Sequence, residues 1–150
     1  MISKILQSNN AILNYHRITQ NDNTDKPNDE LAVSAKRFKE QLIFLKKNYN
    51  LVALDNLINF ERTAKPSISI TFDDGYKDNL SMALPILNEL NIPATVYIIT
   101  KFYQNDFNVW WMELQDYIWS SSDNIKFIYS EKNFNFSIKN NSEKNKCFFE

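Results

Sequence analysis

This 150-residue sequence contains only one glycine, one cysteine and one histidine. Glycine often forms tight turns, and cysteine and histidine often serve in metal or catalytic sites. The single cysteine, Cys147, excludes an internal disulfide and any zinc site built from several thiolates. No apolar run approaches the roughly 18 residues of a membrane span. The opening residues MISKILQSNN lack the apolar centre of a secretory signal peptide. We therefore predict a cytoplasmic protein.

An excess of charge of either sign is also lacking. The 17 Lys and Arg residues nearly balance the 18 Asp and Glu residues, which gives a net charge of −1 and a pI near 5.9. Because the charges are interspersed, we predict neither a nucleic-acid partner nor a membrane partner. The sequence indicates no oligomeric state. Its 43% hydrophobic and 14% aromatic content are typical of a folded globule, and the length fits about one domain.

Strand-like and helix-like segments alternate through the first two thirds of the chain. A helix is predicted after a cap at Ser34, a short one from a cap at Asp55, and a third that enters through Asp78 and kinks or restarts at Pro85. This rhythm is typical of a parallel α/β sheet or barrel. The predicted strands lie near residues 11–17, 50–54, 67–73 and 94–100.

Two of these strands carry further expectations, and the rhythm stops after Thr100. Residues 67–73 alternate polar and apolar with period two, whereas residues 94–100 are nearly all apolar, as in strands covered on both faces. The remaining sequence predicts an aromatic helix in NVWWMELQDYIWS, a hairpin from NIKFIYS and FNFSIKN, and a helical pattern in SEKNKCFFE. No repeat or linker marks a second domain.

The strand SISITF ends in two adjacent carboxylates, Asp73 and Asp74, followed by the only glycine. Neighbouring like charges are unfavourable unless a cation or a shared proton relieves them, and glycine suits a sharp turn. Chemistry gathers at the carboxyl ends of parallel strands, so one carboxylate can bind a metal while the other acts as a base. Alternatively, one caps the next helix and the other is solvated.

A phosphohydrolase with an aspartate nucleophile also ends a strand with Asp and Gly, in the order Asp-x-Asp-Gly. In this chain the nucleophile position of that motif falls on Phe72, which cannot attack a phosphorus atom. The spacing therefore counts against phosphoryl transfer.

Several segments together resemble the polysaccharide deacetylase family of the NodB-like, carbohydrate esterase type. They are TFDDG, ALPIL in the helix, NIPATVYI, the upstream ILNYHRI, the helix FKEQLIFLKKNYNLVAL and the aromatic VWWMELQDYI. The core of the resemblance covers about residues 10–100, and the aromatic helix and hairpin at about 107–140 look like an insertion. The whole chain, residues 1–150, is then a single partial deacetylase domain.

The resemblance implies an α/β fold, a partial (β/α) barrel that lacks the family's C-terminal strands. It implies a hydrolase of non-peptide carbon–nitrogen bonds that removes acetyl groups from an N-acetylated polysaccharide with a divalent metal such as zinc. Carried over to this chain, Asp73 is the catalytic base and Asp74 the metal ligand. The metal would polarise the amide and lower the pKa of its bound water toward about 7.

The chain departs from the family at the metal site. The family adds two histidines, four or five positions apart, well after the strand that ATVYIIT resembles, whereas this chain has only His16, upstream. His16 and Tyr76 are predicted to line the site, with His16 either a metal ligand or locally hydrogen-bonded. We favour a chain cut within the insertion over a degenerate relative that binds carbohydrate without hydrolysis. An inactive fragment is a third possibility.

Three tryptophans, Trp110, Trp111 and Trp119, fall in the aromatic segment. They can stack on sugar rings or pack in a core, and we favour the core because large aromatic side chains dominate protein interiors. Tyr15 is a further candidate for lining the site. Cys147 has no partners that indicate a metal role, so we expect an ordinary thiol.

Overall fold

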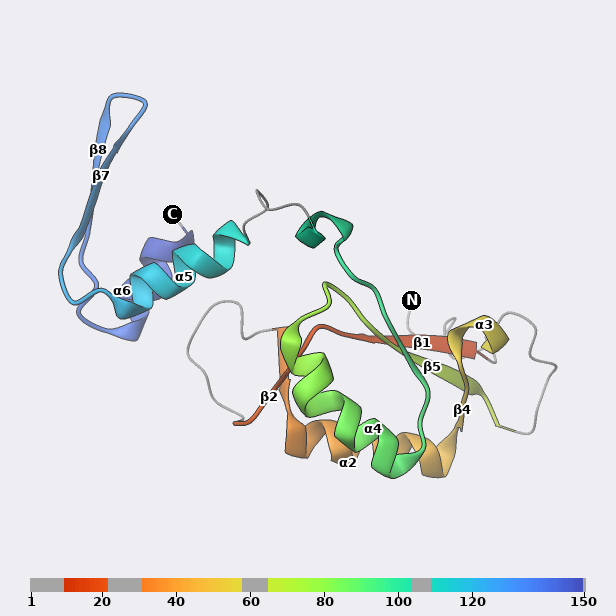
Figure 1. Cartoon of the computed structure of the whole chain (residues 1–150). Coiled ribbons are helices and arrows are strands. Elements are labelled where there is room, and N and C mark those ends of the chain that lie inside the picture. The colour runs from red at the N-terminus through yellow and green to blue at the C-terminus, as the bar shows by residue number, and fades with distance from the viewer. Residues whose placement is uncertain (1–9, 22–30, 58–64, 104–108, 150) are drawn as a thin grey trace. The chain divides into compact units, whose positions relative to one another are not determined.

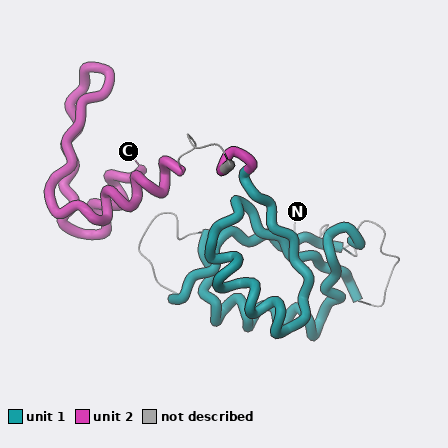
Figure 2. Tube along the Cα trace, in the orientation of Figure 1, with its two compact units in different colours: residues 1–22, 31–99 teal, residues 23–30, 100–150 magenta. Residues whose placement is uncertain are grey.

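The computed structural model describes residues 10–21, 31–57, 65–103 and 109–149 (Figure 1). The chain divides into two compact units, coloured separately in Figure 2. Unit 1 comprises residues 1–22 and 31–99, and unit 2 comprises residues 23–30 and 100–150. The division between residues 99 and 100 coincides with the predicted end of the strand–helix alternation.

Unit 1 is built on a parallel sheet with β5 (Ser67–Phe72) at its centre. Strand β1 (Asn10–Tyr15) runs along the whole of β5, with Tyr15 opposite Phe72. Strand β4 (Asn50–Leu51) pairs with the start of β5, and β6 (Ala94–Val96) pairs with its end. Because all these pairings are parallel, the carboxyl ends of β1, β5 and β6 share one edge of the sheet. The predicted α/β class is confirmed.

The four strands predicted before residue 100 all occur, but they are shorter, and the strand at residues 32–34 was not predicted. The strand predicted at residues 11–17 breaks at His16, after which β2 (Arg17–Thr19) leaves the sheet and pairs with β3 (Ala32–Ser34). The strand predicted at 50–54 keeps two residues, and the strand predicted at 94–100 keeps three. Hydrophobic pattern therefore located the strands but not the residues at which pairing ends.

Burial differs from the pattern-based expectation in two strands. All six residues of β5 are buried, so its alternating polar residues do not mark a solvated face. Ser69 and Thr71 are accommodated because their hydroxyls donate hydrogen bonds, to the carbonyl of Val52 and to the side chain of Asn14. Conversely, β6 is not covered on both faces, since Val96 is 45% exposed.

The core of unit 1 lies between the sheet and two helices, α2 (Ala35–Asn48) and α4 (Leu84–Leu90), on the same side of the sheet (Figure 1). As predicted, the Ser34 hydroxyl caps α2 by accepting a hydrogen bond from the backbone of Arg37. The buried stripe of α2 packs against the apolar residues of β5, each such side chain contributing about 1.5–3 kcal/mol. The stripe consists of Phe38, Leu42 and Leu45.

The helix after β5 starts as a π-helical turn, η2 (Asn79–Ala83), and continues as α4 with Pro85 in its first turn. The change from π-helix to α-helix thus falls beside Pro85, where the sequence predicts a kink or a restart, and proline fits the first turn of an α-helix. The predicted cap at Asp55 is wrong, since Asp55 lies inside the four-residue helix α3 (Leu54–Leu57). The rest of that predicted helix falls outside the described residues.

Unit 2 contains the predicted aromatic helix, hairpin and final helix. These are α5 (Trp110–Ser120), the antiparallel strands β7 (Ile125–Tyr129) and β8 (Lys132–Phe136), and α6 (Asn141–Phe149). Cys147 is buried in a small core that Trp119 joins, whereas Trp110 is 65% exposed. Among the described helices of either unit, none has the length and apolar character needed to cross a bilayer.

Candidate active site

The two carboxylates lie in a tight turn directly after β5. Strand pairing continues one residue past β5, because the Asp73 amide donates to the Tyr15 carbonyl at 3.0 Å. The backbone then turns through left-handed conformations, with φ of +67° at Asp74 and +66° at Gly75. A Cβ on Gly75 would lie 2.8 Å from a methyl carbon of Ile98. Glycine is therefore required both for its backbone freedom and for this close approach.

The carboxylate of Asp73 sits beside the end of β1. Its Oδ2 atom accepts a hydrogen bond of 2.8 Å from Nδ2 of Asn14 and lies 4.0 Å from Nε2 of His16. The Asp73 side chain is 42% exposed and that of His16 is 27% exposed, so solvent reaches both. The structure thus brings together two of the predicted site residues, with the histidine next to the predicted base rather than next to Asp74.

The buried hydroxyl of Thr71 holds the Asn14 side chain that bonds Asp73. Thr71 Oγ1 donates a hydrogen bond of 2.9 Å to Oδ1 of Asn14, and Thr71 is 3% exposed. Thr71 and Asp73 are two positions apart in an extended segment, so they face the same side of the sheet. Sequence reasoning missed Asn14 and Thr71, although pairing β1 with β5 in register would have placed them side by side.

A second cluster fastens the β1–β2 corner to the segment after the turn. Arg17 Nε donates to Asp78 Oδ2 at 3.0 Å, and the Ile18 amide donates to Asp78 Oδ1 at 3.1 Å. Oriented to suit its neighbours, the Asn79 side-chain amide donates to the His16 carbonyl at 2.9 Å. These bonds hold the backbone of His16 against the helix that follows the Asp pair. Asp78 enters the helix as predicted but makes no capping hydrogen bond.

Two tyrosines considered for the site have different surroundings. Tyr76 follows the turn, and the Arg17 guanidinium lies 5.2 Å from its ring centre, a cation–π contact. Tyr15 instead points into the core, with its ring 5.0 Å from that of Phe38, and its hydroxyl donates to Gln41. Burial raises the pKa of Tyr15. Tyr15 therefore does not line the site.

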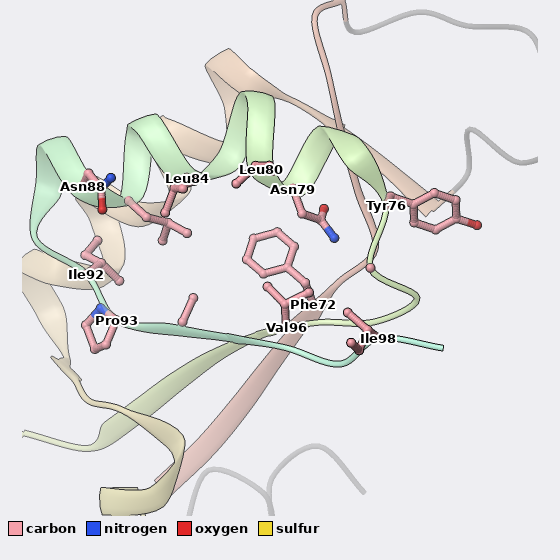
Figure 3. Close-up of a pocket in the computed structure, with 13 residues that line it drawn as sticks. Phe72, Tyr76, Asn79, Leu80, Leu84, Asn88, Ile92, Pro93, Val96 and Ile98 are labelled. Atoms are coloured by element: carbon pink, nitrogen blue, oxygen red, sulfur yellow. The ribbon is translucent and has the colours of Figure 1, made fainter. Parts of the chain in front are cut away.

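A cavity of about 500 Å³ lies between the helix that contains α4 and the β6 segment (Figure 3). Neither Asp73 nor Asp74 is among its described lining residues, and the ring of Tyr76 points away from it (Figure 3). The lining is mostly apolar. It consists of Phe72, Gly75, Tyr76, Asn79, Leu80, Leu84, Leu87, Asn88, Ile92, Pro93, Ala94, Val96 and Ile98.

The described residues do not fit a catalytic zinc site, which usually takes three protein ligands. No group of three His, Cys, Asp or Glu side chains gathers anywhere in the described ranges. Asp74 is half-buried and makes no side-chain hydrogen bond or ion pair to another described residue. His16 approaches Asp73 instead. A metal ion bound here would need ligands beyond those that this part of the chain brings together.

Comparison with known sequences identifies a partial match. Residues 60–130 match the sequence model of the family described as polysaccharide deacetylase. A protein of Bacillus subtilis named as a polysaccharide deacetylase is 33% identical over 95 residues, covering 60% of this chain and 32% of that protein. The poly-β-1,6-N-acetyl-D-glucosamine N-deacetylase of Staphylococcus epidermidis is 30% identical over 109 residues, covering 63% of this chain and 38% of that enzyme. The chain thus spans about a third of the length of these curated relatives.

Solved structures agree on the fold. A polysaccharide deacetylase from Bacillus cereus superposes with a TM-score of 0.51 at 27% identity, covering 74% of this chain and 36% of that chain. A de-N-acetylase from Aggregatibacter actinomycetemcomitans gives a TM-score of 0.52 at 20% identity, covering 84% of this chain and 45% of that chain. The four-stranded parallel sheet is consistent with a partial barrel of this type. The resemblance to the polysaccharide deacetylase family, indicated by the TFDDG segment and its flanking elements, is therefore confirmed over part of the chain.

Proposed function

We propose that this chain contributes the catalytic base of a hydrolase that removes N-acetyl groups from a polysaccharide, and that Asp73 is that base. The observation that carries the proposal is a solvent-accessible carboxylate at the carboxyl end of a central parallel strand, 4.0 Å from the only histidine of the chain. Strand ends of this kind are where open α/β sheets and barrels place their reacting groups.

In the proposed deacetylation, the carboxylate of Asp73 takes part in two proton transfers. Asp73 takes a proton from a water molecule while the water oxygen bonds to the acetyl carbonyl carbon. The carbon–nitrogen bond then breaks, and the proton passes to the departing nitrogen, which leaves acetate and a free amine on the sugar. Nε2 of His16 lies 4.0 Å from Oδ2 of Asp73, beside the position of both steps.

The substrate class follows from a curated relative. The Staphylococcus epidermidis protein acts on poly-β-1,6-N-acetyl-D-glucosamine, as its name states. We therefore propose a polymer that contains N-acetylglucosamine as the substrate of the domain to which this chain belongs.

Metal dependence remains part of the proposal, with Asp74 as the candidate ligand. The described residues do not supply a three-ligand site, so no step above is routed through a metal. Asp74 is suited to a ligand role because its carboxylate makes no hydrogen bond or ion pair with another described side chain.

The test is acetate release from an N-acetylglucosamine oligomer, measured for the whole chain with added Zn²⁺ or Co²⁺. We expect Asp73→Asn to lower the rate by about 10²–10⁴-fold, the range typical of a positioned general base. Asp55→Asn, which changes an exposed carboxylate in α3, is the matched control and should leave the rate unchanged.

Two outcomes would contradict the proposal. Acetate release that is equal in wild type and Asp73→Asn would remove Asp73 from the reaction. Glycan binding without any acetate release, by the wild-type chain with either metal, would instead support a carbohydrate-binding role without hydrolysis.

A further inference from the structure

We propose that Asn14 is a positioning residue that presents one chosen oxygen of Asp73 to the reacting water. The side-chain amide of Asn14 holds Oδ2 of Asp73, and the hydroxyl of Thr71 orients that amide. The inference rests on the proposed role of Asp73 as the base and adds two residues to that site.

The three side chains form a chain of hydrogen bonds across two paired strands. Asn14 stands opposite Thr71 in the β1–β5 register, and Asp73 follows two positions after Thr71. The Thr71 hydroxyl donates to Oδ1 of Asn14 at 2.9 Å, and Nδ2 of Asn14 donates to Asp73 at 2.8 Å. Both distances are those of well-formed hydrogen bonds, and the bond to an ionised carboxylate belongs to the stronger class.

The chain of bonds has a defined direction. An asparagine amide has a donor end and an acceptor end, so its orientation depends on what each end faces. Rotating the Asn14 amide by half a turn would bring Oδ1 against an oxygen of Asp73, and two acceptors would then face each other. The buried hydroxyl of Thr71 satisfies Oδ1 in the observed orientation. Thr71 and Asp73 therefore favour the same orientation of the amide.

The consequence is that the two oxygens of Asp73 become different. Asn14 and His16 both approach Oδ2, at 2.8 Å and 4.0 Å respectively. No described residue donates a hydrogen bond to Oδ1, and the side chain is 42% exposed. Oδ1 is thus the oxygen left to take the proton from water. The direction from which water must attack is set by an amide that does not itself react.

The kinetic test compares isosteric changes with conservative ones in the whole chain, using the acetate-release assay. Thr71→Val and Asn14→Leu keep side-chain size but remove the hydrogen bonds, and we expect each to lower kcat about 10- to 100-fold with KM unchanged, as for a misaligned catalytic group. Thr71→Ser keeps the hydroxyl and should retain wild-type kcat. Thr95→Val makes the same change opposite Thr71 on β6 and serves as the control.

A second measurement is independent of turnover. In the wild-type chain, the Asn14 side-chain amide proton that bonds Asp73 should have an NMR signal distinct from that of the other proton on the same nitrogen, and it should exchange more slowly with solvent. Thr71→Val and Asp73→Ala should each remove that protection, whereas Thr95→Val should not. Circular dichroism on every variant shows whether the fold is kept.

These measurements separate the two hypotheses. If the wild-type chain releases no acetate, the proposed function fails, and the amide signals still decide whether Thr71 orients Asn14. If the wild type is active and both Thr71→Val and Asn14→Leu keep full kcat, the positioning role is overturned. It is equally overturned if the Asn14 amide signals are the same in wild type, Thr71→Val and Asp73→Ala.

Discussion

At the scale of single residues, the turn after β5 is shaped by backbone conformation and by one close contact. Asp74 and Gly75 both have left-handed φ values, and aspartate adopts that region more readily than most residues with a side chain. At Gly75 a side chain would not fit without a shift, because its Cβ would lie 2.8 Å from a methyl carbon of Ile98. The only glycine of the chain therefore stands where the site most needs one.

Replacing Gly75 with alanine should lower the free energy of unfolding by about 1–3 kcal/mol, through backbone strain and the contact with Ile98. Because the contacting atom belongs to a side chain, Ile98→Ala in the same chain should relieve part of the loss and leave the strain. Urea denaturation of the two single variants and the double variant measures this. Strictly additive losses would show that the contact contributes nothing.

Tyr15 gives a pH-dependent prediction. Burial raises its pKa above the ordinary value of 10.0, so the folded protein holds the proton more tightly than the unfolded chain. The associated stability is complete below pH 10.0 and is lost as the pH rises from that value through the raised pKa. The unfolding free energy should thus fall with increasing pH less steeply for Tyr15→Phe than for wild type. Denaturant titrations between pH 8 and 11 test this, and parallel curves would contradict it.

At the scale of elements, the sequence predicted which segments form strands and helices better than where they end. Ser34, Pro85 and the hairpin of unit 2 could be predicted because capping, proline and turn rules are local. The ends of β4 and β6 could not be predicted, because pairing with β5 decides where each strand ends. The sequence placed Asp73 and His16 at the ends of strands but did not predict the contact between them. Asn14 required the register.

The ion pair of Arg17 and Asp78, which joins β2 to η2, should contribute measurably to stability. Both side chains are largely buried, at 22% and 16% exposure, and Asp78 also accepts from the Ile18 amide. We expect Asp78→Ala to lower the unfolding free energy by about 2–3 kcal/mol, because a charged guanidinium loses its partner. A double-mutant cycle with Arg17→Ala should give a coupling of about 1–3 kcal/mol.

The chain offers a matched comparison in Lys39 and Glu89, an ion pair whose side chains are 39% and 58% exposed. The same cycle on this exposed pair should give about 0–1 kcal/mol of coupling. Equal coupling energies for the two pairs would contradict the view that burial makes the Arg17–Asp78 pair the stronger one.

At the scale of the whole molecule, the sequence itself limits metal binding. One histidine and one cysteine are present, Cys147 is buried in unit 2, and the described carboxylates form no three-ligand group. Calorimetric titration with Zn²⁺ should therefore show weak binding without saturation in the micromolar range, and Asp74→Asn should remove it. Stoichiometric, tight binding that survives Asp74→Asn would contradict this prediction and reveal a different ligand set.

Side chains along β1 alternate between the two faces of the sheet, and this alternation decides which of them reach the site. Tyr15 packs among the rings beneath the sheet, while its neighbours Asn14 and His16 turn to the opposite face and meet Asp73. A shift of β1 along β5 by one residue would exchange the two faces of the strand. The amide of Asn14 would then lie in the hydrophobic core, and the ring of Tyr15 would lie against the carboxylate of Asp73. The position of Asn14 and His16 beside Asp73 therefore depends on the alignment of β1 with β5, and so does any reaction that uses these side chains.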